Sequence, residues 1–107
     1  EVIECALAAL TGCINAAVSM SALARGIELD RLETTVRIAW NPFVLLGLEE
    51  AEGTDQFGDL KVELEVGGKD LTEEDMAFLR RSVSRSALYN LMTLAHRCSP
   101  VIRLADR

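Results

Sequence analysis

Residues 5–24 read CALAALTGCINAAVSMSALA, and this stretch decides the fold. It contains no Asp, Glu, Lys or Arg, and most of its side chains are small. Because alanine is the strongest helix former, the stretch predicts a helix over about residues 3–25 that ends at Gly26, a residue suited to a left-handed C-cap. A helix that is uncharged on every side must be surrounded by protein or by lipid.

The length of this helix would also suit a membrane span, since about twenty residues cross a bilayer. Its composition does not, because alanine dominates and Thr, Asn and Ser residues interrupt a stretch with only three leucines. We therefore interpret it as the central helix of a soluble protein with no membrane partner. The chain begins with Glu1, and no basic segment precedes the apolar stretch, so no signal peptide is indicated and a trimmed product or fragment is expected.

The composition describes one small domain without a nucleic-acid partner. The chain has 107 residues, 50% of them hydrophobic and 26% charged, which is an ordinary balance for a folded domain. Its formal net charge of −6 argues against nucleic-acid binding, which needs a basic surface. Residues 76–107 hold six arginines and one acid, Asp106, which we interpret as a solvated face with favourable cations near a helix end.

Three cysteines, Cys5, Cys13 and Cys98, are the candidate reactive groups. Their odd number and their spacing match no zinc site, and they indicate free or redox-active thiols in a reducing compartment. Cys13 lies in the middle of the uncharged helix. It is either a small core side chain or a nucleophile held at a controlled depth.

Alternation of apolar and polar residues predicts two strands of an antiparallel sheet. Residues 31–40 (RLETTVRIAW) and 60–66 (LKVELEV) both alternate with a period of two. Between them lie Asn41-Pro42, a short apolar run and an acidic loop at residues 49–59.

The second half of the chain predicts helices and a last strand. Thr72 can cap a helix, with Asp75 completing a capping box. A further helical piece follows at about residues 87–96, and residues 101–104 can form a short strand. The order predicts an α+β domain. Because two or three strands make a thin cover for an apolar helix of this length, we expect an obligate oligomer.

The first helix and the strand after it resemble a known family. ALAALTGC at residues 6–13 and ARGIELDRLE at residues 24–33 are similar to the osmotically inducible protein C / organic hydroperoxide resistance (OsmC/Ohr) family. In that family a helix of the form LLAALxxC carries the first reactive cysteine, and RGIxLxxL leads into the next strand. FVLLGL at residues 43–48 and LTEEDMAFLRR at residues 71–81 fit the family's second half in order and spacing.

The resemblance implies a single OsmC-like domain over residues 1–107, N-terminally incomplete. Its fold would be a long central buried helix packed on a curved antiparallel sheet in an intertwined homodimer. Its activity would be the thiol-dependent reduction of organic hydroperoxides in the cytoplasm, as a defence against oxidative stress. The resemblance implies an external thiol or dithiol as reductant, and no metal or organic cofactor.

Carried over residue by residue, the resemblance places Cys13 at the attacking thiol and Glu4 at or beside the family's helix-start glutamate. The family's activating arginine lies in N-terminal strands that this chain lacks, so it is not assigned. The resolving position falls at or beside Ser86, in SALYN, which would put the chain in a single-cysteine branch. Cys98, twelve residues later, is the alternative resolving thiol.

Two other functions stay open. A non-peroxidase member of the family could keep the dimer and bind a small hydrophobic ligand, which Ser86 at the resolving position favours. A thiol-nucleophile hydrolase could use the same scaffold, because a thiolate that attacks oxygen can also attack carbon.

Overall fold

The computed structural model describes residues 1–51 and 56–105. Residues 52–55 of the expected acidic loop, and Asp106 and Arg107 at the end of the arginine-rich segment, lie outside the described residues. The elements in chain order are α1 (Val2–Arg25), β1 (Arg31–Arg37), β2 (Lys61–Gly67), α2 (Glu73–Ser82), a 3₁₀ turn η1 (Val83–Arg85) and α3 (Ala87–Thr93). This mixture of helices and an antiparallel sheet is the predicted α+β class.

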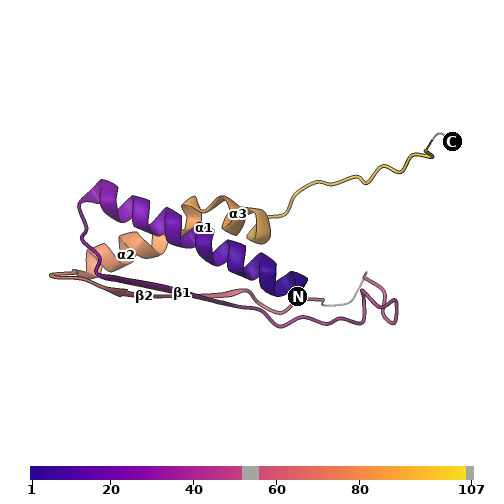
Figure 1. Ribbon diagram of the computed structural model, residues 1–107, viewed down its shortest axis with the longest axis horizontal. Coiled ribbons are helices and arrows are strands. Elements are labelled where there is room, and N and C mark those ends of the chain that lie inside the picture. The colour runs from indigo at the N-terminus through magenta and orange to yellow at the C-terminus, as the bar shows by residue number, and fades with distance from the viewer. Residues whose placement is uncertain (52–55, 106–107) are drawn as a thin grey trace.

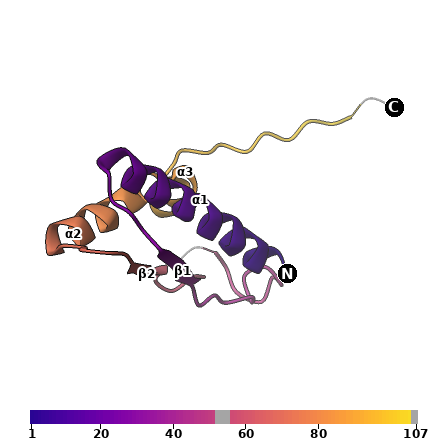
Figure 2. The same cartoon turned by 60° about the vertical axis from the view of Figure 1, so that its left-hand side comes forward.

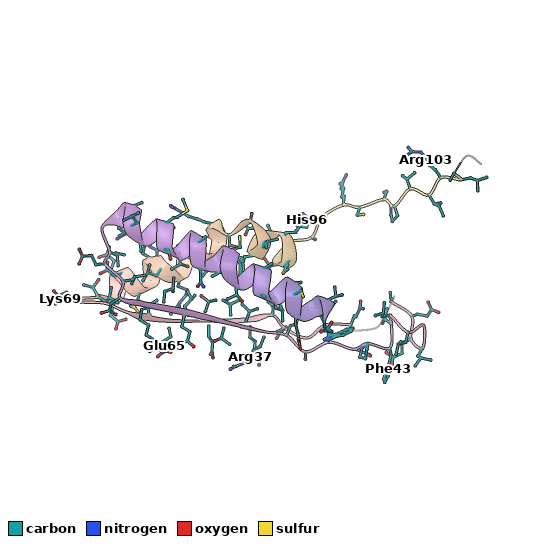
Figure 3. All side chains as sticks on the ribbon, in the orientation of Figure 1. Arg37, Phe43, Glu65, Lys69, His96 and Arg103 are labelled. Carbon is teal, nitrogen blue, oxygen red and sulfur yellow. The ribbon has the colours of Figure 1, made fainter. Side chains whose placement is uncertain are left out.

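The sheet is an antiparallel pair, and α1 lies along one of its faces (Figure 1). Its register runs from Arg31 opposite Gly67 to Arg37 opposite Lys61. The apolar side chains of both strands pack toward α1, as alternation requires. Figure 3 shows Arg37 and Glu65 on the opposite face, and exposed ion pairs such as Arg31 with Glu65 at 3.1 Å lie there.

The core is a single stripe of α1 together with the helical segment that follows β2. Leu10, Ile14, Val18 and Ala22 repeat every four residues, which places them on one side of the helix. All four are buried, and Leu79 of α2 and Val83 of η1 complete the cluster. The segment that follows β2 consists of α2, η1 and α3. It packs across the middle and C-terminal half of α1 (Figure 2).

The predicted helix boundaries rest on caps that the structure confirms. Gly26 closes α1 in the left-handed conformation, with φ 77°, and its N–H donates to the last carbonyls of the helix. Thr72 and Asp75 form a reciprocal capping box at the start of α2, with hydrogen bonds of 3.0 and 3.2 Å.

The expectation of a fully buried central helix is met on one side only. Among the described residues, nothing covers the side of α1 turned away from both the sheet and α3, and Leu23 and Met20 are 81% and 71% exposed. The reason is physical: two strands and three short helical pieces are too narrow to surround a helix of 24 residues. They leave apolar side chains of α1 exposed along its uncovered side.

Two predicted boundaries and one predicted strand are wrong. The first strand ends at Arg37, and Trp40 forms only an isolated bridge with Phe57 ahead of Pro42, which cannot donate to a ladder. The helix expected at residues 87–96 ends at Thr93. The strand expected at residues 101–104 does not form, because within the described residues it has no partner strand. Instead residues 94–105 make an extended tail that leaves the body (Figures 1 and 2).

The core stripe yields a test in which one substitution is compared at two depths of the same helix. Val18→Ala should lower the free energy of unfolding by about 2 kcal/mol, because a buried side chain loses its contacts and leaves a cavity. Val2→Ala, at a position 80% exposed, should change it by less than about 0.5 kcal/mol. Denaturant titration followed by circular dichroism measures both, and equal losses would contradict the assigned core face.

Candidate functional site

Cys13 lies at the edge of the core, half-buried in the middle of α1. Its neighbour Ile14 and the preceding Leu10 are fully buried, so the thiol stands between the packed stripe and the solvent. The side of α1 that carries Cys13 faces the start of α3. This position allows a small molecule to reach the sulfur while the helix holds it in place.

The sulfur accepts hydrogen bonds from three groups of the segment 86–88. The Ser86 hydroxyl is the strongest of these donors, and the backbone amides of Leu88 and Ala87 are the others. These donors lower the pKa of the Cys13 thiol, with the Ser86 hydrogen bond as the largest cause, while partial burial acts in the opposite direction. The site therefore favours the thiolate, which is the nucleophilic form of cysteine.

Local backbone geometry explains why these donors are free. The chain leaves the helical conformation at Ser86, where ψ is 121°, and α3 starts at the next residue. The first amides of a helix have no partner within it, so those of Ala87 and Leu88 can point to another acceptor. Ser86 is 1% exposed, and its hydroxyl oxygen accepts from the Tyr89 N–H at 3.2 Å, which leaves its own hydrogen for the sulfur.

The parts of α1 and α3 that surround the Cys13 thiol carry only neutral side chains. No charged side chain lies on α3 or in residues 5–24 of α1. Arg85, next to Ser86, directs its guanidinium to the buried Ser21 hydroxyl at 3.5 Å. The stabilisation of the thiolate therefore comes from hydrogen-bond donors rather than from an ion pair.

The structure does not bring Glu4 to Cys13 within one chain. Nine residues are two and a half helical turns, so Glu4 lies about 13 Å from Cys13 along the axis and on the opposite side of the helix. Its carboxylate is exposed. The role predicted for Glu4 by the resemblance therefore has no support from contacts inside the chain.

The other two cysteines also lie away from the thiol. Cys98 is exposed in the extended tail, five residues beyond the end of α3. Cys5 is exposed on α1, about 12 Å from Cys13 along the helix. Of the two candidate resolving positions, Ser86 is the one that contacts Cys13.

The two backbone amides are not predicted from the sequence. A signal for them exists, because Ser86 three residues before Tyr89 is a typical N-cap and marks a helix start with free donors. What it cannot show is the acceptor, which lies on a helix more than seventy residues earlier. Among the described residues, no cluster of His, Cys, Asp or Glu has the arrangement of a metal site.

The fold and the site together define an α+β domain whose apolar central helix presents a thiol to the start of a second helix. The family model described as OsmC-like protein matches residues 3–104, nearly the whole chain. The chain belongs to the OsmC-like family, as the resemblance predicted. A comparison with curated proteins gives no match.

Family membership also bears on the membrane question. By length and composition α1 could cross a membrane, a test that the core helix of a soluble protein also passes. OsmC-like proteins are generally soluble. The sheet and α2, η1 and α3 pack against one side of α1.

The geometry of the site predicts the effect of removing its strongest donor. Ser86→Ala should raise the pKa of Cys13, because the thiolate loses the hydroxyl hydrogen bond. The pH at which alkylation of Cys13 is half-maximal should therefore move upward, so that less thiolate is present near pH 7. Ser84→Ala is the matched control, since the Ser84 hydroxyl bonds only the exposed Arg81 carbonyl. An unchanged pH profile in Ser86→Ala would contradict the assigned contact.

Proposed function

We propose that this protein is a thiol-dependent peroxidase that reduces organic hydroperoxides through Cys13. The observation that carries the proposal is the placement of Cys13 under three hydrogen-bond donors, at a half-buried position in an OsmC-like chain. The same donors that stabilise the thiolate can also hold the oxygen of a bound peroxide. The reducing interior of the cell, the cytoplasm, is the compartment that suits three free thiols.

The chemistry proceeds in two stages. The Cys13 thiolate attacks the distal peroxide oxygen, a sulfur–oxygen bond forms, the oxygen–oxygen bond breaks, and the leaving alkoxide takes a proton to become an alcohol. Cys13 is then a sulfenic acid. An external thiol condenses with it to a mixed disulfide and releases water, and a second thiol exchanges to restore Cys13.

The resolving step is assigned to an external thiol because a hydroxyl stands beside Cys13. Ser86 cannot form a disulfide, and its contact with the sulfur occupies the place that a resolving thiol would need. Cys98 is the internal alternative. Five tail residues could span about 17 Å, enough for Cys98 to fold back along α3 toward Cys13.

A second candidate function is the binding of a small hydrophobic ligand without redox chemistry. The observation that favours it is a cavity of about 870 Å³ between the first turns of α1 and the end of α3. Apolar side chains make up most of its lining, among them Ile3, Leu7, Phe57 and Met92. In the peroxidase proposal the same cavity would take the organic part of the hydroperoxide.

The deciding experiment is the reaction of the reduced protein with one equivalent of an organic hydroperoxide, followed by intact mass and cysteine mapping. Cys13→Ser should abolish turnover, because the serine hydroxyl stays protonated and is a weak nucleophile. Cys5→Ser, on the same helix at an exposed position, should keep full activity.

The species formed distinguishes the mechanisms. A sulfenic acid on Cys13 supports external reduction, and a Cys13–Cys98 disulfide would identify an internal resolving thiol. Three unmodified thiols would overturn the peroxidase proposal in favour of ligand binding or hydrolysis.

We also propose that the bare face of α1 is the centre of a homodimer. The uncovered side carries small residues at helical spacing, and these allow close approach of a second helix: Ala9, Gly12, Ala16 and Ser19. A Cβ added to Gly12 would meet nothing within 4 Å, so the chain itself leaves this space open. A second copy of α1 is apolar and equally uncovered, and twofold pairing would bury both faces at once.

A charge on this face should separate the dimer. Ala16→Glu would place two carboxylates in an apolar contact without partners, a cost of several kcal/mol. Ala51→Glu adds the same charge at an exposed loop position and should leave the assembly intact. Sedimentation velocity measures both. A wild-type monomer, or a dimer unaffected by Ala16→Glu, would contradict the proposed interface.

A further inference from the structure

The backbone between α2 and α3 changes its hydrogen-bond partners at one point. The turn η1 ends at Ser86, where the chain leaves the helical conformation before α3 begins. In a helix that continued through this point, the Leu88 N–H would donate to the Ser84 carbonyl four residues earlier. Here the Leu88 N–H faces the Cys13 sulfur instead, and the Ser84 carbonyl accepts from a side-chain donor of α3.

Asn90 supplies that donor. Its side-chain Nδ2 donates to the Ser84 carbonyl oxygen over 2.9 Å, across six residues of chain. Its backbone N–H donates to the Ser86 carbonyl at 3.1 Å. Within the described residues, Asn90 is the one side chain of α3 that hydrogen-bonds to η1. It therefore ties together the two sides of the interruption.

We propose that Asn90 is a positioning residue for the Cys13 site. By bonding the Ser84 carbonyl across the break at Ser86, it holds the start of α3 against η1 and keeps the Leu88 N–H directed at the sulfur. The proposal rests on the function given above, in which Cys13 is the reactive thiol. Asn90 touches neither the sulfur nor a substrate in this role, and it acts through the backbone that it holds.

The physical reason is the geometry of the break. Ser86 has extended backbone and its hydroxyl caps α3 at Tyr89, so the Asn90 side chain is the bond that joins α3 back to η1. Ser84 is exposed, so water can replace Asn90 at its carbonyl, and what is lost with the Asn90 side chain is the tie between the two segments. Without that tie, the start of α3 would be held less firmly against Cys13, and the thiolate would be stabilised less.

Few charges stand near Cys13 to mask this effect. The facing elements are α1, η1 and α3, and residues 5–24 and 87–93 contain no charged side chain. Arg85 is the one charged residue of η1, and its guanidinium bonds Ser21. A shift in the titration of Cys13 would therefore report a change in hydrogen bonding.

The test compares two substitutions in α3 that each remove one hydrogen bond from a side chain to the backbone. Asn90→Leu keeps the approximate size of the side chain and removes the donor to Ser84. Thr93→Val removes the 2.7 Å bond from the Thr93 hydroxyl to the Tyr89 carbonyl, which lies within α3. Both are made in a chain with Cys5→Ser and Cys98→Ser, so that alkylation reads Cys13 alone. The measurements are alkylation rate against pH and hydrogen exchange of the Leu88 amide.

Asn90→Leu should shift the alkylation midpoint to higher pH and decrease the exchange protection of the Leu88 amide, as its contact with the sulfur loosens. Thr93→Val should change neither. An unchanged midpoint in a folded Asn90→Leu protein would overturn the proposal, and so would an equal shift in Thr93→Val. If circular dichroism shows Asn90→Leu unfolded, Asn90→Ala is subjected to the same comparison.

The readouts need no peroxide, so they separate this inference from the proposed function. A shifted midpoint in a protein that does not reduce hydroperoxides would sustain the role of Asn90 and reject the peroxidase. If the wild type turns over hydroperoxide but Asn90→Leu leaves the alkylation midpoint unchanged, the peroxidase proposal is supported and the role of Asn90 is rejected.

Discussion

The requirement that an uncharged helix be covered determines the rest of this structure. Residues 5–24 offer water no charge on any side, so every other element is arranged to shield part of them. The β1–β2 pair shields one side with its apolar face, and Leu79 and Val83 close over the stripe formed by Leu10, Ile14 and Val18. The remaining side is left exposed by the described residues, and it is the side on which we propose that a second copy packs.

The same helix sets the terms of the chemistry. A thiolate in the middle of an apolar helix cannot draw on a charged neighbour of that helix, and the facing α3 has none to offer. The available donors are a hydroxyl and two backbone amides, and an interrupted helix supplies all three from three consecutive residues. The break at Ser86 is thus a feature of the site as much as a connection between α2 and α3.

Local patterns in the sequence predict the elements that depend on local physics. The caps at Gly26 and at Thr72 with Asp75 follow from neighbouring residues, and so does the alternation in β1 and β2. Residues 101–104 favour extended backbone, so their pattern predicts a strand, but pairing needs a partner that no local pattern specifies. The alternation in residues 31–40 likewise predicts a strand that is longer than β1, because the end of β1 depends on how Trp40 meets Phe57 across the chain.

In the candidate site, the side chains can be predicted from the sequence, but the backbone donors depend on the fold. Cys13 can be recognised in the sequence as a reactive side chain in the middle of an uncharged helix. The match to the family also indicates Ser86, and Ser86 contacts Cys13 in the structure. The amides of Ala87 and Leu88 belong to the backbone and have no letter of their own in the sequence. Their direction depends on the break in the backbone at Ser86 and on the packing of α3 against α1. The donors that act on the thiol are therefore brought to it only when the chain is folded.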